Sequence, residues 1–403
     1  MNILKQKIID KIKSEGPISF ETFMEMALYY PGLGYYMKET ANIGRSGDFY
    51  TSSHLHPIFG AMLGRQMEEM WEVMGRPADF RVVEMGAGMG YLAKDMLGYL
   101  KTSAVSSQKS EVKESFFRHL TYVMVERNTT IRTIQQELLT EFRDKVEWVS
   151  DLNDLEPTTG CFLSNELLDA FPVKAVEMDD GLMEIYVSVP SHPPIPSLVG
   201  GDDFIEIKMP VSSEIREYLG EYSIELSKCY RTEVNLKLKE WLRDVEERLS
   251  EGFILTIDYG YPAWDYYGED RNRGTLLCYY QHQVNEDPYA HIGEQDLTAH
   301  VNFSAVKKWG EEFGLKTVGF CPQGTYLISL GLDEVMTELY PVRKNGLSNG
   351  VYGDSPDAFE IAKIKGLILP QGMGESHKVM IQYKGHGEPK LRGFSVRNNR
   401  DKL

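Results

Sequence analysis

Short runs of apolar residues recur along the chain, separated by stretches with the 3.6-residue spacing of amphipathic helices. Apolar runs of this length are typical of strands buried in a mostly parallel sheet. The pattern predicts seven strands: Arg81–Met85, Thr121–Glu126, Lys145–Val149, Cys161–Asn165, Phe253–Tyr259, Lys316–Phe320 and Lys378–Tyr383. Helices are predicted at Tyr91–Leu100 and Thr129–Phe142. We therefore expect an α/β fold with a seven-stranded, doubly wound, Rossmann-like sheet.

Changes of pattern predict regions inserted into this sheet. After Pro172, apolar residues alternate over Val173–Met209 around the proline-rich stretch Pro190–Pro196, which indicates strands joined by a loop that cannot pair regularly. Insertions at the carboxyl edge of an α/β sheet often cover a ligand crevice. The predicted regions are a helical N-terminal region (1–72), the first part of the core (73–172), a β-rich and helical subdomain (173–250), the second part of the core (251–331), a helical insertion (332–365), and the last core strand with a tail (366–403).

Composition narrows the class of protein. The chain of 403 residues has 43 Lys and Arg against 60 Asp and Glu, a formal net charge of −17, so we expect no nucleic-acid partner. The four cysteines form no C-x-x-C pair, which argues against both a disulfide framework and a zinc site. No apolar run approaches the ~20 residues of a membrane span. Together with an N-terminus that lacks a secretory or transit pattern, these features lead us to expect a cytoplasmic protein without a metal.

The strongest local signal is a glycine loop between the first strand and its helix. Glycine permits positive φ and close approach of a ligand to the backbone, and the N–H groups at a helix start can hold a carboxylate. S-adenosylmethionine offers such a carboxylate, together with an ammonium that Glu84 could neutralise. A dinucleotide loop, G-x-G-x-x-G, would need glycine at Tyr91, so the spacing favours the methyl donor over NAD. The expected cofactor-binding residues here are Glu84, Gly86, Ala87, Gly88 and Gly90. A tight turn without a ligand is the alternative.

Acidic residues at the ends of the next two strands extend this prediction. Glu126 ends the second strand, where an acid can accept hydrogen bonds from both ribose hydroxyls. Asp151 follows the third strand, where an acid could accept from the adenine amino group. An ordinary surface carboxylate is the alternative for Glu126.

Polar residues also appear abruptly at the carboxyl end of the fourth strand, in Asn165, Glu166 and Asp169. Methyl transfer is an in-line displacement, so it requires alignment and a free lone pair on the acceptor. Two carboxylates can orient a guanidinium through bidentate hydrogen bonds. We assign candidate catalytic roles to these three residues and to Asp258, which ends the fifth strand. The alternatives are a strand cap for Asn165, a helix cap for Asp169 and a turn cap for Asp258.

Several sequence blocks in order resemble the MidA-like methyltransferases, a family that includes the mitochondrial respiratory complex I assembly methyltransferase. The resemblance covers nearly the whole chain. The blocks are Tyr29–Tyr36, Gly47–Ser52, the glycine loop, Asn165–Val173, Asp258–Tyr261, Gly274–Leu276, Gly293–Val301 and Met373–Met380. The chain departs from the family pattern at Ser53-His54, where Pro-Glu is usual, and at His377, where Phe is usual. These departures bear on the methyl acceptor more than on the cofactor.

The resemblance implies a class I methyltransferase fold with S-adenosyl-L-methionine as cofactor and protein arginine as the first candidate for the acceptor. It further implies that the segment with Asp48 and Thr51 folds over the cofactor. The expected partner is a protein substrate, with a respiratory-complex-like subunit as one candidate, and the exposed insertions make a homodimer plausible. The alternative functions are a scaffold that binds the cofactor without essential catalysis and, disfavoured by Tyr91, an NAD-linked oxidoreductase.

Overall fold

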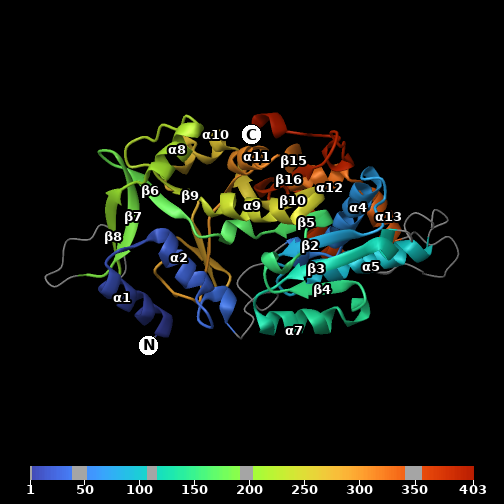
Figure 1. Cartoon of the computed structure of the whole chain (residues 1–403), viewed down its shortest axis with the longest axis horizontal. Coiled ribbons are helices and arrows are strands. Elements are labelled where there is room, and N and C mark those ends of the chain that lie inside the picture. The colour runs from blue at the N-terminus through green and yellow to red at the C-terminus, as the bar shows by residue number, and fades with distance from the viewer. Residues whose placement is uncertain (1, 39–51, 107–115, 191–202, 341–355) are drawn as a thin grey trace. The chain divides into compact units, whose positions relative to one another are not determined.

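The computed structural model describes residues 2–38, 52–106, 116–190, 203–340 and 356–403, which form two compact units (Figure 1). The sheet unit takes in residues 50–167, 242–260 and 306–403. The insert unit takes in residues 1–49, 168–241 and 261–305. Each unit is built from segments far apart in the sequence, because the chain leaves and re-enters the sheet.

The seven predicted strands are confirmed as the sheet of the sheet unit. Its order is β15-β16-β10-β5-β2-β3-β4. The strands are β15 (Lys316–Pro322), β16 (His377–Lys384), β10 (Leu249–Tyr261), β5 (Thr158–Asn165), β2 (Phe80–Met85), β3 (Leu120–Val125) and β4 (Val146–Val149). Neighbours from β10 to β4 run parallel, whereas β16 is antiparallel to both β10 and β15.

The order of the strands fixes where a ligand can bind. From β2 the chain proceeds outward to β3 and β4 and then returns to the other side of β2 as β5. The carboxyl ends of β2 and β5 therefore flank the topological switch point, which is the ligand crevice of doubly wound sheets. The expected α/β, doubly wound fold is confirmed.

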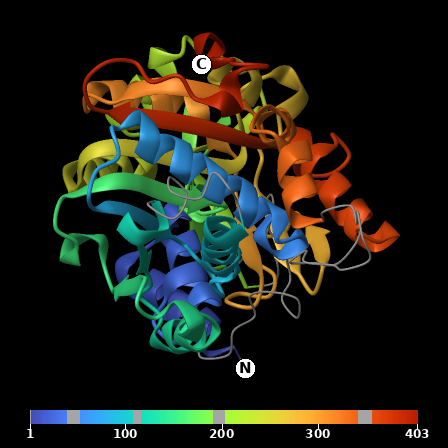
Figure 2. The same cartoon turned by 90° about the vertical axis from the view of Figure 1, so that its right-hand side faces the viewer.

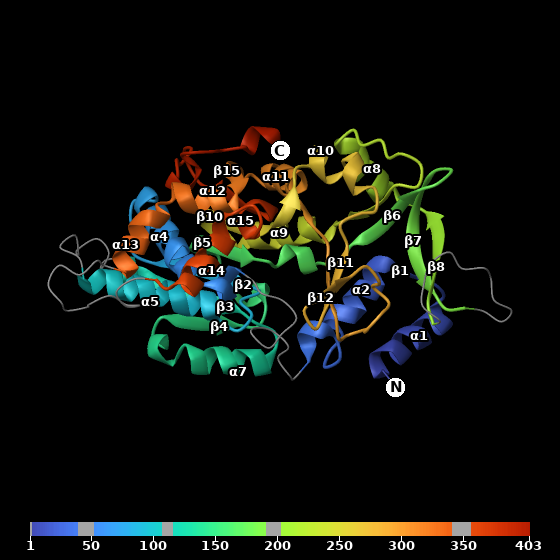
Figure 3. The same ribbon diagram turned by 180° about the vertical axis from the view of Figure 1, so that it is seen from behind.

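Helices cover this sheet. They are α3 (Ser52–Leu55), α4 (Ile58–Val73), α5 (Tyr91–Ser106), α7 (Thr129–Leu138), α11 (Phe303–Glu312), α12 (Gln323–Ser329), α13 (Leu332–Leu339), α14 (Ala358–Ile368) and α15 (Met373–Ser376). Helices α4 and α5 contact each other (Figure 2). Their apolar faces join one core with Val82, Met124 and Leu163 of the sheet. Helices α12 to α15 form a contiguous group (Figure 3).

The insert unit has its own apolar core and two antiparallel sheets. One sheet has the order β1-β7-β6-β9 with β8 beside β7, and the other has the order β12-β11-β13. The strands are β1 (Ile18–Ser19), β6 (Lys174–Met178), β7 (Leu182–Ser188), β8 (Ile205–Pro210), β9 (Arg231–Val234), β11 (Leu277–Tyr280), β12 (Gln283–Asn285) and β13 (Asp296–Thr298). The short strand β14 (Val301–Asn302) belongs to neither of these sheets and pairs with β10 as an eighth strand of the larger sheet. The helices are α1 (Ile3–Glu15), α2 (Phe20–Tyr29), α8 (Ser213–Glu221) and α10 (Ala263–Tyr266), and α9 (Lys237–Arg248) leads back to the sheet unit.

The structure differs from the predicted pattern at β9. The pattern over Ser212–Ser250 predicts helix throughout, but Arg231–Val234 forms a strand that pairs with β6 between α8 and α9. A four-residue segment is too short for a period of two to be distinguished from one of 3.6, so its pairing is set by tertiary contact. Helices α1 and α2 belong to the insert unit, whereas α4 belongs to the sheet unit. The predicted region boundaries stay a prediction.

Candidate active site

The glycine loop follows β2 at the switch point and has the backbone that its sequence requires. Gly86, Gly88 and Gly90 have φ values of 72°, 51° and 86°. The N–H of Gly90 closes the turn on the carbonyl of Ala87 at 2.9 Å, and α5 begins at the next residue. A Cβ on Gly86 would lie 2.9 Å from Cδ1 of Leu167. The loop therefore ends at the N-terminus of the long helix α5. Backbone N–H groups there can donate hydrogen bonds to an anionic group.

Glu84 lies buried beneath this loop. Oε2 of Glu84 accepts a hydrogen bond from the hydroxyl of Tyr122 on β3 at 2.6 Å. Burial raises the pKa of Glu84 to about 7, and the hydrogen bond from Tyr122 offsets part of that rise. A buried carboxylate near neutrality can become charged when a cation binds beside it, which suits the ammonium of a methionyl group.

Gln135 of α7 connects the glycine loop to the next two strands. Its Nε2 donates to the carbonyl of Gly88 at 2.8 Å and to Oε2 of Glu126 at 3.3 Å. Its Oε1 accepts from Nε1 of Trp148 on β4 at 3.0 Å. The side chain is fully buried. Sequence reasoning missed Gln135 because a single glutamine in an amphipathic helix carries no motif.

The two acids after β3 and β4 have different environments. Glu126 is half-buried, its Oε1 accepts from the backbone N–H of Asn128 at 2.7 Å, and burial raises its pKa. Asp151 accepts from the backbone N–H of Asn153 and, at 2.6 Å, from Arg127. These bonds lower its pKa, the one from the Asn153 N–H most strongly. The Asp151 side chain therefore caps η3 (Leu152–Asp154). Glu126 is instead joined to the glycine loop by Gln135, which donates to both.

Glu166 follows β5 directly, and its carboxylate is hydrogen-bonded to α3 and to the last residue of β5. Its φ of 50° is a left-handed conformation that is rare outside glycine and aims its side chain differently from the strand. Oε1 accepts from the backbone N–H of Ser52 at 2.9 Å and from Nδ2 of Asn165 at 3.3 Å. Nε2 of His377, on β16, lies 3.6 Å from the same oxygen. One oxygen of this carboxylate is thus fixed in place.

Three polar atoms around this anchored oxygen are buried and have no hydrogen-bond partner within the described part of the chain. They are Oδ1 of Asn165, Oε2 of Glu166 and Nε2 of His377. Leaving such an atom unpaired in a protein interior costs ~1–3 kcal/mol. Groups of this kind, next to a backbone in an uncommon conformation, are typical of functional sites, where a ligand supplies the missing hydrogen bonds.

The remaining two predicted catalytic residues lie in different surroundings. Asp258 of β10 is fully buried and accepts from the backbone N–H of Leu167 at 3.2 Å and of Tyr259 at 2.8 Å, so it fixes the turn that follows Glu166. Asp169 lies in the insert unit on η4 (Leu168–Ala170), where it is buried and its carbonyl accepts from the N–H of Ala299 at 2.8 Å. Asp48 and Thr51 lie outside the described residues.

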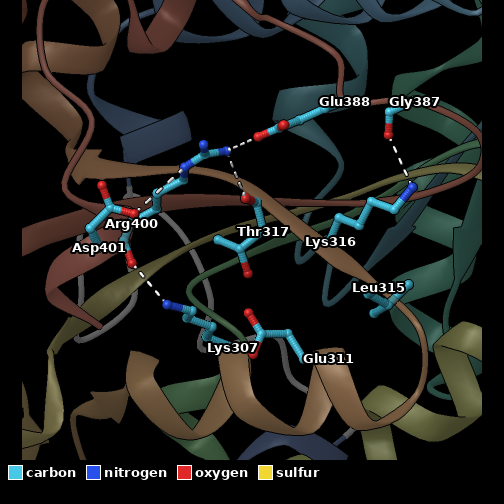
Figure 4. Close-up of a pocket in the computed structure, with 9 residues that line it drawn as sticks. All are labelled: Lys307, Glu311, Leu315, Lys316, Thr317, Gly387, Glu388, Arg400 and Asp401. Atoms are coloured by element: carbon cyan, nitrogen blue, oxygen red, sulfur yellow. Dashed lines mark hydrogen bonds and ion pairs between the residues drawn. The ribbon is translucent and has the colours of Figure 1, made fainter.

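A pocket of about 510 Å³ is found at the opposite edge of the sheet, where β15 begins and β16 ends (Figure 4). Two of its cationic groups are engaged by the protein: Arg400 pairs with Glu388 at 2.6 Å, and Nζ of Lys316 donates to the carbonyls of Gly385 and Gly387. The switch point lies at the other end of the strands, so this pocket is separate from the candidate active site.

The family model that this chain matches and the fly and human proteins similar to it belong to one class, the methyltransferases. Residues 62–321, more than half of the chain, match the model of a family described as "Putative S-adenosyl-L-methionine-dependent methyltransferase". The chain is 30% identical over 399 residues to the mitochondrial protein arginine methyltransferase NDUFAF7 homolog of Drosophila melanogaster, covering 95% of this chain and 85% of the fly protein. It is 28% identical over 348 residues to human mitochondrial NDUFAF7, covering 80% of this chain and 72% of the human protein.

A solved structure from Burkholderia thailandensis, bound to S-adenosyl-homocysteine, is similar over 99% of this chain and 96% of its own, with 28% identity and a TM-score of 0.83. The sheet order and the glycine loop define a class I methyltransferase fold. The chain belongs to the S-adenosyl-L-methionine-dependent methyltransferase family that its sequence matches, the MidA-like methyltransferases. Its cofactor is S-adenosyl-L-methionine.

One expectation from the sequence is wrong. We expected a cytoplasmic protein, but the fly, rat and human relatives are all named mitochondrial, which contradicts that expectation. Widely spaced cysteines indicate a reducing compartment without identifying which one it is. Within the described residues, no helix is long and apolar enough to cross a membrane.

Proposed function

We propose that the chain transfers the methyl group of S-adenosyl-L-methionine to an arginine side chain of a protein, with Glu166 as the residue that orients the guanidinium. The relatives from fly and human are named protein arginine methyltransferases, which supports this acceptor. The observation that carries the proposal is the Glu166 carboxylate, with Oε1 anchored by Ser52 and Asn165 and Oε2 buried without a partner among the described residues.

The residues around the glycine loop fit the cofactor. Backbone N–H groups at the start of α5 would hold its carboxylate, Glu84 its ammonium, and Glu126 its ribose hydroxyls. When bound, the cofactor supplies a methyl group on a positively charged sulfur. Gly86 and Gly90 have positive φ, and a Cβ at these positions would approach Leu167 at 2.9 Å and Gln135 at 3.4 Å, so the turn that presents these N–H groups requires glycine. The adenine contact of Asp151 and the contribution of Asp48 and Thr51 stay predictions.

For the acceptor, the chain's own groups supply orientation and charge. Oε2 of Glu166 and Oδ1 of Asn165 would accept N–H bonds from the guanidinium, which holds it in one plane and stabilises its positive charge. Asp258 would act as a positioning residue, because it fixes the Leu167 amide directly after Glu166. The role of Asp169 as a second carboxylate for the acceptor stays a prediction. Holding the acceptor in an aligned geometry is the main means by which such a site accelerates transfer.

The test is methyl transfer from isotopically labelled S-adenosyl-L-methionine to an arginine-containing peptide and to its lysine counterpart, followed by mass spectrometry. Glu166→Gln keeps an oxygen for the Ser52 N–H but loses the charge, and we expect transfer to arginine to fall ~100-fold or more. Glu156→Gln, an exposed acid just before β5, is the matched control and should leave the rate unchanged.

The same experiment separates the enzyme from a cofactor-binding scaffold. A scaffold predicts no transfer by the wild-type protein and unchanged assembly of its partner when Glu166 is replaced. Equal rates for Glu166→Gln and wild type would refute the role of Glu166. A respiratory-complex-like subunit as substrate and a homodimer remain predictions, which affinity purification with mass spectrometry and analytical ultracentrifugation would test.

A further inference from the structure

We propose that His377 determines acceptor specificity by accepting a hydrogen bond at Nε2 from the same planar group that Glu166 holds, an inference that rests on the proposed arginine methyltransferase function. His377 is the first residue of β16, and its side chain is 0% exposed. His377 is not among the site residues predicted from the sequence. The sequence singles it out only because the MidA-like family usually has phenylalanine at this position.

The imidazole of His377 is held on two sides. Its ring centroid lies 4.0 Å from that of Tyr259, the residue opposite it on β10. Its Nδ1 lies 3.2 Å from Oγ of Ser376, within hydrogen-bond distance. Packing against a ring and a hydrogen bond at Nδ1 together fix the direction in which Nε2 points.

Nε2 faces the anchored carboxylate without bonding to it. The 3.6 Å from Nε2 to Oε1 of Glu166 is too long for a hydrogen bond, and Oε1 already accepts from Ser52 and Asn165. Within the described residues, Nε2 has no hydrogen-bond partner. When Nδ1–H donates to Ser376, Nε2 carries a lone pair and is a third acceptor beside Oε2 of Glu166 and Oδ1 of Asn165.

A group of three acceptors selects a ligand rich in N–H donors. A guanidinium presents five N–H bonds in one plane, so it can serve several fixed acceptors at once, whereas an ammonium presents three donors around a point charge. Phenylalanine at this position would preserve a ring against Tyr259 but offer no acceptor. The histidine therefore adds recognition of the acceptor group and leaves the glycine loop unchanged.

The test compares His377→Phe and His377→Gln in the full-length protein. Gln keeps an acceptor near the position of Nε2, whereas Phe keeps only the ring. We measure kcat and KM for an arginine peptide and its lysine counterpart, and Kd for S-adenosyl-homocysteine by calorimetry. His386→Gln, an exposed histidine after β16, is the control.

For His377→Phe we expect kcat/KM for the arginine peptide to fall ~10–100-fold, mainly through KM, with Kd for S-adenosyl-homocysteine within about twofold of wild type. His377→Gln should recover most of the loss. An unchanged kcat/KM in His377→Phe would overturn the inference, as would a loss of S-adenosyl-homocysteine binding that matches the loss of transfer. If wild type methylates neither peptide, or only lysine, the proposed arginine function itself fails, and the inference fails with it.

Discussion

The hydroxyl of Tyr122 donates a hydrogen bond to Glu84 at 2.6 Å, joining two adjacent parallel strands directly beneath the glycine loop. Both side chains are buried, and each changes the ionisation of the other. Burial is the largest cause of the raised pKa of Tyr122, and the Glu84 charge adds to it. Burial holds the pKa of Glu84 at about 7. The carboxyl group nearest the predicted ammonium of the cofactor therefore titrates close to neutral pH.

This ionisation predicts a pH dependence of stability. The unfolded chain ionises Glu84 near its usual value of 4.5, whereas the folded protein keeps the proton up to about 7. Between these values the folded state binds more protons, so the free energy of unfolding falls as pH rises and levels off above 7. The Glu84 contribution is up to ~3 kcal/mol. Urea denaturation at pH 5 and pH 7.5 should show a smaller fall for Glu84→Gln than for wild type. An equal fall in the two proteins would exclude Glu84 as the source.

Cofactor affinity should have the opposite pH dependence. Only the ionised carboxylate attracts the ammonium, so we expect the affinity for S-adenosyl-homocysteine to rise as pH increases from 6 to 8, by up to ~10-fold. Binding at pH 7 should release protons, measurable by calorimetry in buffers of different ionisation heat. Tyr122→Phe removes a hydrogen bond that lowers the pKa of Glu84, and should weaken binding at pH 7. Affinity that is flat with pH would argue against contact between Glu84 and the ammonium.

Replacing Gln135 tests how the glycine loop is held in place without changing any residue of the loop. Gln135→Leu leaves the carbonyl of Gly88 and the indole N–H of Trp148 without their partner. We expect a loss of ~1–3 kcal/mol in the free energy of unfolding and weaker binding of S-adenosyl-homocysteine. Gln136→Leu, on the exposed side of the same helix, is the control. The role of Gln135 is contradicted when both variants bind the ligand equally well.

Elements of the fold that are marked by a local pattern of apolar residues or glycines could be predicted from the sequence. Most of the seven strands could be predicted because they are near-continuous buried apolar runs, as in β5, β10 and β16. The glycine loop could be predicted because three alternate glycines follow a strand. β9 was not predicted, because four residues cannot establish a period and its pairing with β6 joins segments distant in the chain.

Three acids of the candidate site could be nominated from the sequence because each lies at or next to the carboxyl end of a strand, although their roles stay predictions. Glu84, Glu126 and Glu166 have that position, which a sequence reveals. Tyr122, Gln135 and Ser52 act through contacts between elements far apart in sequence, and His377 reaches Glu166 from a strand more than 200 positions later. Such contacts depend on the sheet order, which follows from tertiary packing.

The most direct test of the account is calorimetric titration of S-adenosyl-homocysteine into the wild-type protein and into Gly88→Val. A β-branched residue is strained at the φ of 51° found for Gly88, so the substitution should distort the turn of the loop. Gly98→Val is the matched control, because a Cβ at Gly98 on α5 would meet nothing within 4 Å. The account predicts micromolar-scale binding in wild type and Gly98→Val, and its loss in a Gly88→Val protein that circular dichroism shows to be folded. Equal binding by Gly88→Val would contradict the assignment of the glycine loop as the cofactor site.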